Sequence, residues 1–123
     1  MILVADSSAL IALAIVDKLE VLDKLFVEVS SNINFNVTLG KGESEAIILY
    51  KELNGDFLLC DDKKAKKFAQ NFGITVIGSL GILLKAKERG LITHIKPLLN
   101  ILKSSKVFID EKTCSLVLKM ANE

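Results

Sequence analysis

Short apolar runs alternate along the chain with longer segments in which apolar residues recur at helical spacing. Strands are predicted at 2–5, 57–60 and 74–77, because short runs of this kind are typical of strands buried in a parallel sheet. Helices are predicted over 9–16, 19–26, 43–53, 63–72, 80–90, 94–104 and 110–120. This alternation predicts an α/β fold, a three-layer α/β/α arrangement whose mostly parallel sheet is covered by helices on both faces.

The segment from 26 to 37 has a different pattern. Residues 26–29 and 33–37 each indicate a strand, and the polar residues 30–32 between them indicate a turn. The helix that follows at 43–53 is apolar over most of its surface, so we expect it to be largely buried.

Polar residues and glycines mark several helix ends. Asp62, Ser79 and Asp110 stand where N-caps are expected. Gly90 is expected to end the helix that precedes it, because glycine readily adopts the left-handed conformation of a helix C-terminus.

The composition indicates one soluble, cytoplasmic domain spanning residues 1–123. Half of the residues are hydrophobic, which supports a substantial core, and 16 lysines and arginines nearly balance 15 aspartates and glutamates. This balance argues against binding to nucleic acid through bulk charge, although it leaves room for a local basic patch. The apolar N-terminus lacks a basic leader, and Asp6 and Asp17 interrupt it too early for a membrane span.

The two cysteines and the single histidine restrict the chemistry. Cys60 and Cys114 lie in apolar stretches without metal-binding spacing, so we expect buried, reduced thiols. One histidine, His94, is too few for a zinc cluster together with these cysteines, and a surface or capping role is expected for it.

Two aspartates follow predicted strands, at the position where ligands bind in open parallel sheets. Asp6 follows the first strand and Asp61 follows the strand at 57–60. If these strands are neighbours, the carboxylates converge, and a cation such as Mg²⁺ or Mn²⁺ would offset their repulsion. The alternative for Asp6, which precedes two serines, is a simple turn.

Other acids have competing interpretations. Glu43 and Glu45 begin the central helix, where acids either reach the same crevice or simply stabilise the helix dipole. Because they are two residues apart, they cannot share one helix face. Capping is favoured for Glu45 and for Asp62, whereas Glu43 is balanced between the two roles.

A basic run follows Asp62. It is either a solvated helix face or a rim that contacts phosphates beside a metal site. With one tyrosine and no tryptophan in the chain, base-stacking platforms are poorly supplied. The run consists of Lys63, Lys64, Lys66 and Lys67.

Three segments together resemble the PIN domain superfamily, the fold of VapC-type toxin ribonucleases, in an uncharacterised prokaryotic branch. They are VADSSALIALA at 4–14, GKGESEAIILYKEL at 40–53, and DFLLCDDKKAKKFAQNFGITVIGSLGILLKAKERGLI at 56–92. The resemblance implies that carboxylates bind Mg²⁺ or Mn²⁺. It also implies that the metal activates a water molecule for attack on an RNA phosphodiester. It implies Asp6, Glu43 and Asp61 as the catalytic and metal-binding acids. It further implies Ser7 as the hydroxyl residue after the first acid and places Asp62 and Ser79 near the pocket rim.

The chain departs from this family's pattern in its middle. The family usually has a helix with another glutamate between the second strand and the central helix, and that helix is missing here. Glu28 is a poor substitute, and Glu45 is a better candidate that does not match the motif. The loss predicts weaker metal binding and exposed apolar surface on the sheet or its neighbours, which would favour a homodimer or larger assembly.

Two functions therefore compete. One is a metal-dependent endoribonuclease, the toxin of a pair with an antitoxin protein as partner and RNA as substrate. The other is a degenerate PIN-like module that binds protein or RNA without cutting. A phosphotransfer receiver lacks its acidic pair at Asp6-Ser7, and a haloacid-dehalogenase-type phosphatase would need an aspartate where Ser8 stands.

Overall fold

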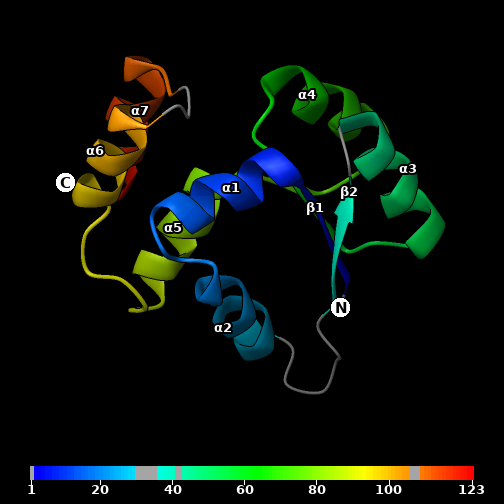
Figure 1. Cartoon of the computed structure of the whole chain (residues 1–123), viewed down its shortest axis with the longest axis horizontal. Coiled ribbons are helices and arrows are strands. Elements are labelled where there is room, and N and C mark those ends of the chain that lie inside the picture. Colours follow the sequence, from blue (N-terminus) through cyan, green and yellow to red (C-terminus); the bar gives the residue numbers. More distant parts are fainter. Residues whose placement is uncertain (1, 30–35, 41–42, 106–108) are drawn as a thin grey trace.

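A four-stranded parallel sheet forms the middle layer of the chain in the computed structural model (Figure 1). Its strand order is β2-β1-β3-β4, so the first strand lies between the second and the third. Ala5 of β1 pairs with Leu39 on one side and with Leu59 on the other. The carboxyl ends of the strands therefore meet at one edge. The strands are β1 (Ile2–Asp6), β2 (Asn36–Gly40), β3 (Phe57–Leu59) and β4 (Val76–Ile77).

The structure describes residues 2–29, 36–40, 43–105 and 109–123, and it does not describe the side chains of residues 2, 7, 26–29, 36–40 and 43–45. No helix in this part of the chain is long and apolar enough to cross a membrane. The helices are α1 (Ser7–Ile15), α2 (Glu20–Val29), α3 (Glu43–Leu53), α4 (Lys63–Asn71), α5 (Ser79–Glu88), α6 (Lys96–Ser104) and α7 (Glu111–Met120).

Helices cover both faces of the sheet, as the alternating pattern predicts. On one face, Leu3 and Leu59 belong to a large buried cluster with residues of α1, α2, α5, α6 and α7. The other face is the side on which α3 and α4 lie (Figure 1). There Val4 and Leu58 pack in a smaller cluster with residues of these two helices. Side chains alternate between the faces of a strand, so burial of adjacent residues requires cover on both sides. The predicted three-layer α/β/α fold is confirmed.

The middle segment differs from the prediction. Residues 26–29, expected as a strand, continue α2, whose buried side chains Val21, Leu22 and Leu25 recur at helical spacing and face the large cluster. The second strand, expected at 33–37, is described over Asn36–Gly40, where Asn36 pairs with Ile2 and Gly40 with Asp6. The expected positions 33–35 lie outside the described residues.

No helix fits between β2 and α3, and exposed apolar side chains lie on helices beside the sheet, whereas the described side chains of the sheet itself are mostly covered. Only residues 41 and 42 separate Gly40, where β2 ends, from Glu43, where α3 begins. The described side chains of β1, from Leu3 to Asp6, are nevertheless buried, as is Leu58 in β3. Among the described residues, the large exposed apolar side chains lie on or next to helices, for example Ile48, Phe68 and Leu116. Both Cys60 and Cys114 are buried, as expected, and burial raises the pKa of the Cys114 thiol.

Gly90 ends α5 as predicted. Its φ of 74° is in the left-handed region, and the N–H groups of Gly90 and Leu91 donate to the carbonyls of Lys87 and Ala86. Asp110 is the N-cap of the last helix, as predicted, and its carboxylate accepts a hydrogen bond of 2.6 Å from the N–H of Thr113. Both end signals therefore act as local chemistry alone predicted.

Glu123 connects the end of the chain to two other helices. Its side chain is only 8% exposed, and its carboxylate accepts hydrogen bonds from Lys87 Nζ (2.9 Å) and from the N–H groups of Ile95 (2.8 Å) and Lys96 (3.0 Å). Burial acts to raise the pKa of this carboxyl, but these three donors outweigh it and lower the pKa to about 2. The ionised side chain therefore fixes the start of α6 against α5.

Replacing this carboxylate, Glu123→Gln, is expected to lower the free energy of unfolding by roughly 1–3 kcal/mol at neutral pH, because charge-assisted hydrogen bonds are lost. The depressed pKa means that wild type has this stability above the ordinary pKa of 4.5 and loses it as pH falls toward about 2. Urea unfolding at neutral and acidic pH should show the difference between the two proteins shrinking over that interval. Glu111→Gln is the matched control, since its side chain is 82% exposed in its pair with Lys103.

Candidate active site

Two aspartates lie at the carboxyl ends of neighbouring strands. Asp6 is the last residue of β1, is 4% exposed, and accepts a hydrogen bond of 2.8 Å from Ser8 Oγ. Asp61 follows β3, the strand that pairs with β1 through Ala5 and Leu59. The condition on which the predicted convergence rested, that the two strands are neighbours, is therefore met.

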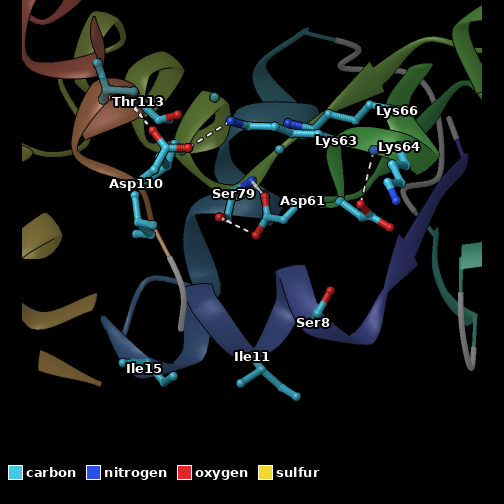
Figure 2. A pocket seen from close by; sticks show the side chains of 16 residues that line it. Ser8, Ile11, Ile15, Asp61, Lys63, Lys64, Lys66, Ser79, Asp110 and Thr113 are labelled. Carbon is cyan, nitrogen blue, oxygen red and sulfur yellow. Dashed lines mark hydrogen bonds and ion pairs between the residues drawn. The ribbon is translucent and has the colours of Figure 1, made fainter. Parts of the chain in front are cut away.

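Asp61 is held by the start of α5. Its two oxygens accept hydrogen bonds from the Ser79 N–H at 2.6 Å and from Ser79 Oγ at 2.7 Å (Figure 2). A carboxylate at a helix N-terminus also interacts favourably with the helix dipole. The prediction that Ser79 caps its own helix is wrong: Gly78 occupies the N-cap position, and the serine hydroxyl turns to Asp61 instead. The two residues are 18 positions apart, so no local pattern could pair them.

Gly78 leaves room for a second charged group beside Asp61. A Cβ atom on Gly78 would lie 2.6 Å from Lys66 Nζ and 2.9 Å from Asp61 Oδ1. The backbone φ of −92° is open to any residue, so the requirement here is space and not conformation. The basic run thus divides in two, with Lys66 half-buried at the site and Lys64 and Lys67 exposed.

A pocket of about 860 Å³ opens in front of Asp61 (Figure 2). Ile11 and Ile15 of α1 form an apolar side of the pocket. Asp110 and Thr113, at the start of α7, form a polar side. Asp110 forms a hydrogen-bonded ion pair with Lys63 at the rim of the pocket, with Lys63 Nζ 2.8 Å from the carboxylate. This hydrogen bond and that from the Thr113 N–H hold the pKa of Asp110 well below its usual range. Lys63 is thus engaged within the chain, which sequence reasoning did not foresee.

Asp62 caps α4 and also lies at the pocket. It is the N-cap of α4 and accepts a hydrogen bond of 3.1 Å from the Lys64 N–H, so the favoured capping role is confirmed. It also lines the pocket next to Asp61. Ser8, which was not among the predicted site residues, donates a hydrogen bond to Asp6 through its hydroxyl and lines the same pocket.

Three other predicted residues have side chains outside the described part of the structure: Ser7, Glu43 and Glu45. The backbone nevertheless places Glu43 at the same sheet edge. β2 ends at Gly40, which pairs with Asp6, and α3 begins at Glu43 just beyond. Asp6 ends β1, Glu43 begins α3, and Asp61 lies in the connection after β3, so all three stand at one edge of the sheet.

The oxygen donors at this edge suit a hard divalent cation. Asp6 is a buried carboxylate that accepts a hydrogen bond from the neutral hydroxyl of Ser8. Buried carboxylates are normally paired or bound to metal. Asp61 and the hydroxyl of Ser8 add oxygen ligands of the kind that Mg²⁺ and Mn²⁺ prefer. Among the described side chains, no group of three or more acids, cysteines or histidines is close enough to complete such a site.

The sequence also matches a known family. A family model described as PIN domain matches residues 29–123, a range that includes Asp61 and Ser79 and begins after Asp6. No curated protein and no solved structure matches the chain. The match covers most of the chain and agrees with the α/β/α fold and the acidic edge of the sheet. The chain therefore belongs to the PIN domain family.

Proposed function

We propose that this protein is a metal-dependent endoribonuclease that hydrolyses RNA phosphodiesters at the acidic edge of the sheet. The observation that carries the proposal is the placement of Asp6 and Asp61 at the carboxyl ends of adjacent parallel strands, with Asp61 lining a pocket bordered by lysines. Membership of the PIN domain family supports nuclease chemistry of this kind.

Asp6 and Asp61 would hold Mg²⁺ or Mn²⁺, with Glu43 as the third acid. When bound there, such a cation would activate water for attack and would stabilise the charge that develops on the phosphate. Ser8 and Ser79 orient the two aspartates through the hydrogen bonds already described. Lys66, beside Asp61, offers a positive charge to the phosphate as it enters the pocket.

In its finer form, the proposal makes the protein a cytoplasmic toxin that is neutralised by an antitoxin and assembles with a second copy. A catalytically degenerate module that binds RNA or protein is the second candidate. It is favoured by the absence of a helix between β2 and α3, since the family's additional glutamate would lie there. Metal binding separates the two candidates.

Isothermal titration of Mn²⁺ into wild type and Asp6→Asn tests the proposal. Wild type is expected to bind about one equivalent, and the variant is expected to lose binding, because the amide removes the charge from a buried ligand. Cleavage of a labelled single-stranded RNA should require Mn²⁺ or Mg²⁺ and stop in EDTA.

Asp17→Asn is the matched control for the loss of one carboxylate. Asp17 is exposed between α1 and α2 with a φ of 56°, a conformation that asparagine tolerates. It should bind metal and cut RNA as wild type does. A wild-type protein that binds no Mn²⁺ at millimolar concentration would refute the nuclease proposal and leave the binding module.

A further inference from the structure

Two phenylalanines form an exposed pair at the end of α4. Phe68 lies on the helix and Phe72 directly follows it; each is 54% exposed, and their ring centroids are 4.9 Å apart. The sequence, with one tyrosine and no tryptophan, indicated few surfaces on which a base could stack. The tertiary structure leaves this pair uncovered, so such a surface is present.

Cations surround the pair. Lys64 and Phe68 are four residues apart, so the lysine lies one turn toward the start of α4 on the same side of the helix. Lys67 is exposed beside it. From α3, Lys51 Nζ lies 5.3 Å from the centroid of the Phe72 ring, within the range of a cation–π contact. The sequence of α4, KKAKKFAQN, contains no acid that would oppose this charge.

The exposed stripe also leads to the candidate active site. α4 begins directly after Asp61 and Asp62, and Phe68 lies about 8 Å along the axis from the first residue of the helix, at 1.5 Å per residue. Lys64, one turn before Phe68 on the same side of α4, also lines the pocket beside Asp61. A ligand that contacts the phenylalanines can therefore extend past Lys64 toward Asp61. This continuity favours an extended, negatively charged ligand over a compact one.

We propose that this basic–aromatic stripe, formed by Lys51, Lys64, Lys67, Phe68 and Phe72, binds single-stranded RNA. An unpaired base stacks on the Phe68–Phe72 pair, and the flanking phosphates contact Lys64 and Lys67. Paired bases have no free face to offer, so the stripe selects single strands over duplexes. The inference rests on the proposed nuclease function and names the form of RNA that it accepts.

Fluorescence anisotropy with a labelled oligouridylate of roughly 12 nucleotides, within the span of typical single-strand sites, tests the proposal in EDTA, where no metal chemistry occurs. Phe68→Leu keeps an apolar side chain but removes the ring, and it should weaken binding about tenfold. Phe68→Tyr keeps the ring and should bind within about twofold of wild type, because every base can stack on it. A duplex of equal length should bind more weakly than the single strand.

The charge component has its own matched pair of variants. Lys64→Gln should reduce the salt dependence of binding by about one phosphate contact. Lys112 is an exposed lysine on α7, and Lys112→Gln should leave the salt dependence unchanged.

Equal affinity of Phe68→Leu and wild type overturns the proposal. So does an absence of wild-type binding at about 100 µM, the weak end of non-specific association. If Phe68→Leu instead dissociates a dimer in light scattering with unchanged RNA affinity, the pair is an interface between two copies. Loss of cleavage with intact binding refutes only the nuclease proposal.

Discussion

Asp61→Asn is expected to lower metal-dependent RNA cleavage more than about 100-fold, because removing a ligand should cost at least as much as removing a partner of that ligand. The side chain lies at the pocket with both oxygens directed by Ser79 (Figure 2). The amide keeps the shape and one acceptor but loses the negative charge. Cleavage rates at saturating Mn²⁺, with circular dichroism to verify folding, measure the effect.

Asp61 could instead have a purely structural role, because its carboxylate accepts a hydrogen bond from the first N–H of α5. Ser79→Ala separates the two roles, because it removes the hydroxyl bond and keeps the backbone bond. If Asp61 is a metal ligand, Ser79→Ala should weaken Mn²⁺ affinity about 10- to 100-fold with little change in melting temperature. If Asp61 only holds the helix, Asp61→Asn lowers the melting temperature while metal binding and cleavage stay within about twofold of wild type.

Leu58→Ala and Leu59→Ala are each expected to lower the free energy of unfolding by roughly 2–5 kcal/mol. Both side chains are almost completely buried, although they are adjacent in β3 and point to opposite faces of the sheet. Leu59 packs in the large cluster and Leu58 in the smaller one, so each truncation leaves a cavity. Urea unfolding of the two variants measures both cores independently.

Leu116→Ala is the control for this pair. Leu116 is an exposed leucine on α7, so its truncation should change stability by less than about 0.5 kcal/mol. A small effect of Leu58→Ala alongside a large effect of Leu59→Ala would mean that α3 and α4 do not cover their face of the sheet. That result would restore the expectation of an exposed sheet.

The fold was largely predictable because its signals are local. Buried parallel strands appear as short apolar runs, and the helix ends at Asp62, Gly90 and Asp110 carry recognisable capping chemistry. The prediction failed at 26–29, where β-branched and aromatic residues suggested a strand. The segment is the end of α2, whose preceding turns are fixed by burial of Val21 and Leu25. Packing overrode the local preference there.

The candidate site was predictable only in part. Asp6 and Asp61 could be selected because a residue that follows a buried parallel strand lies at the ligand-binding edge, wherever the strand falls in the sheet. The side-chain hydrogen bonds that position the residues of the site could not be predicted. Ser79 reaches Asp61 across 18 residues, and Lys63 reaches Asp110 across 47, so both depend on how helices pack and not on neighbouring residues.

The sequence by itself determined that the chain forms an α/β fold with acids at the carboxyl edge of its sheet. This was possible because side-chain periodicity and strand ends are encoded in consecutive residues. Only the tertiary structure decided which strands are neighbours, that Lys66 turns inward beside Asp61, and that Phe68 and Phe72 remain exposed. Apolar residues alone do not reveal this last point, because the exposure of a side chain depends on which helix, if any, packs over it.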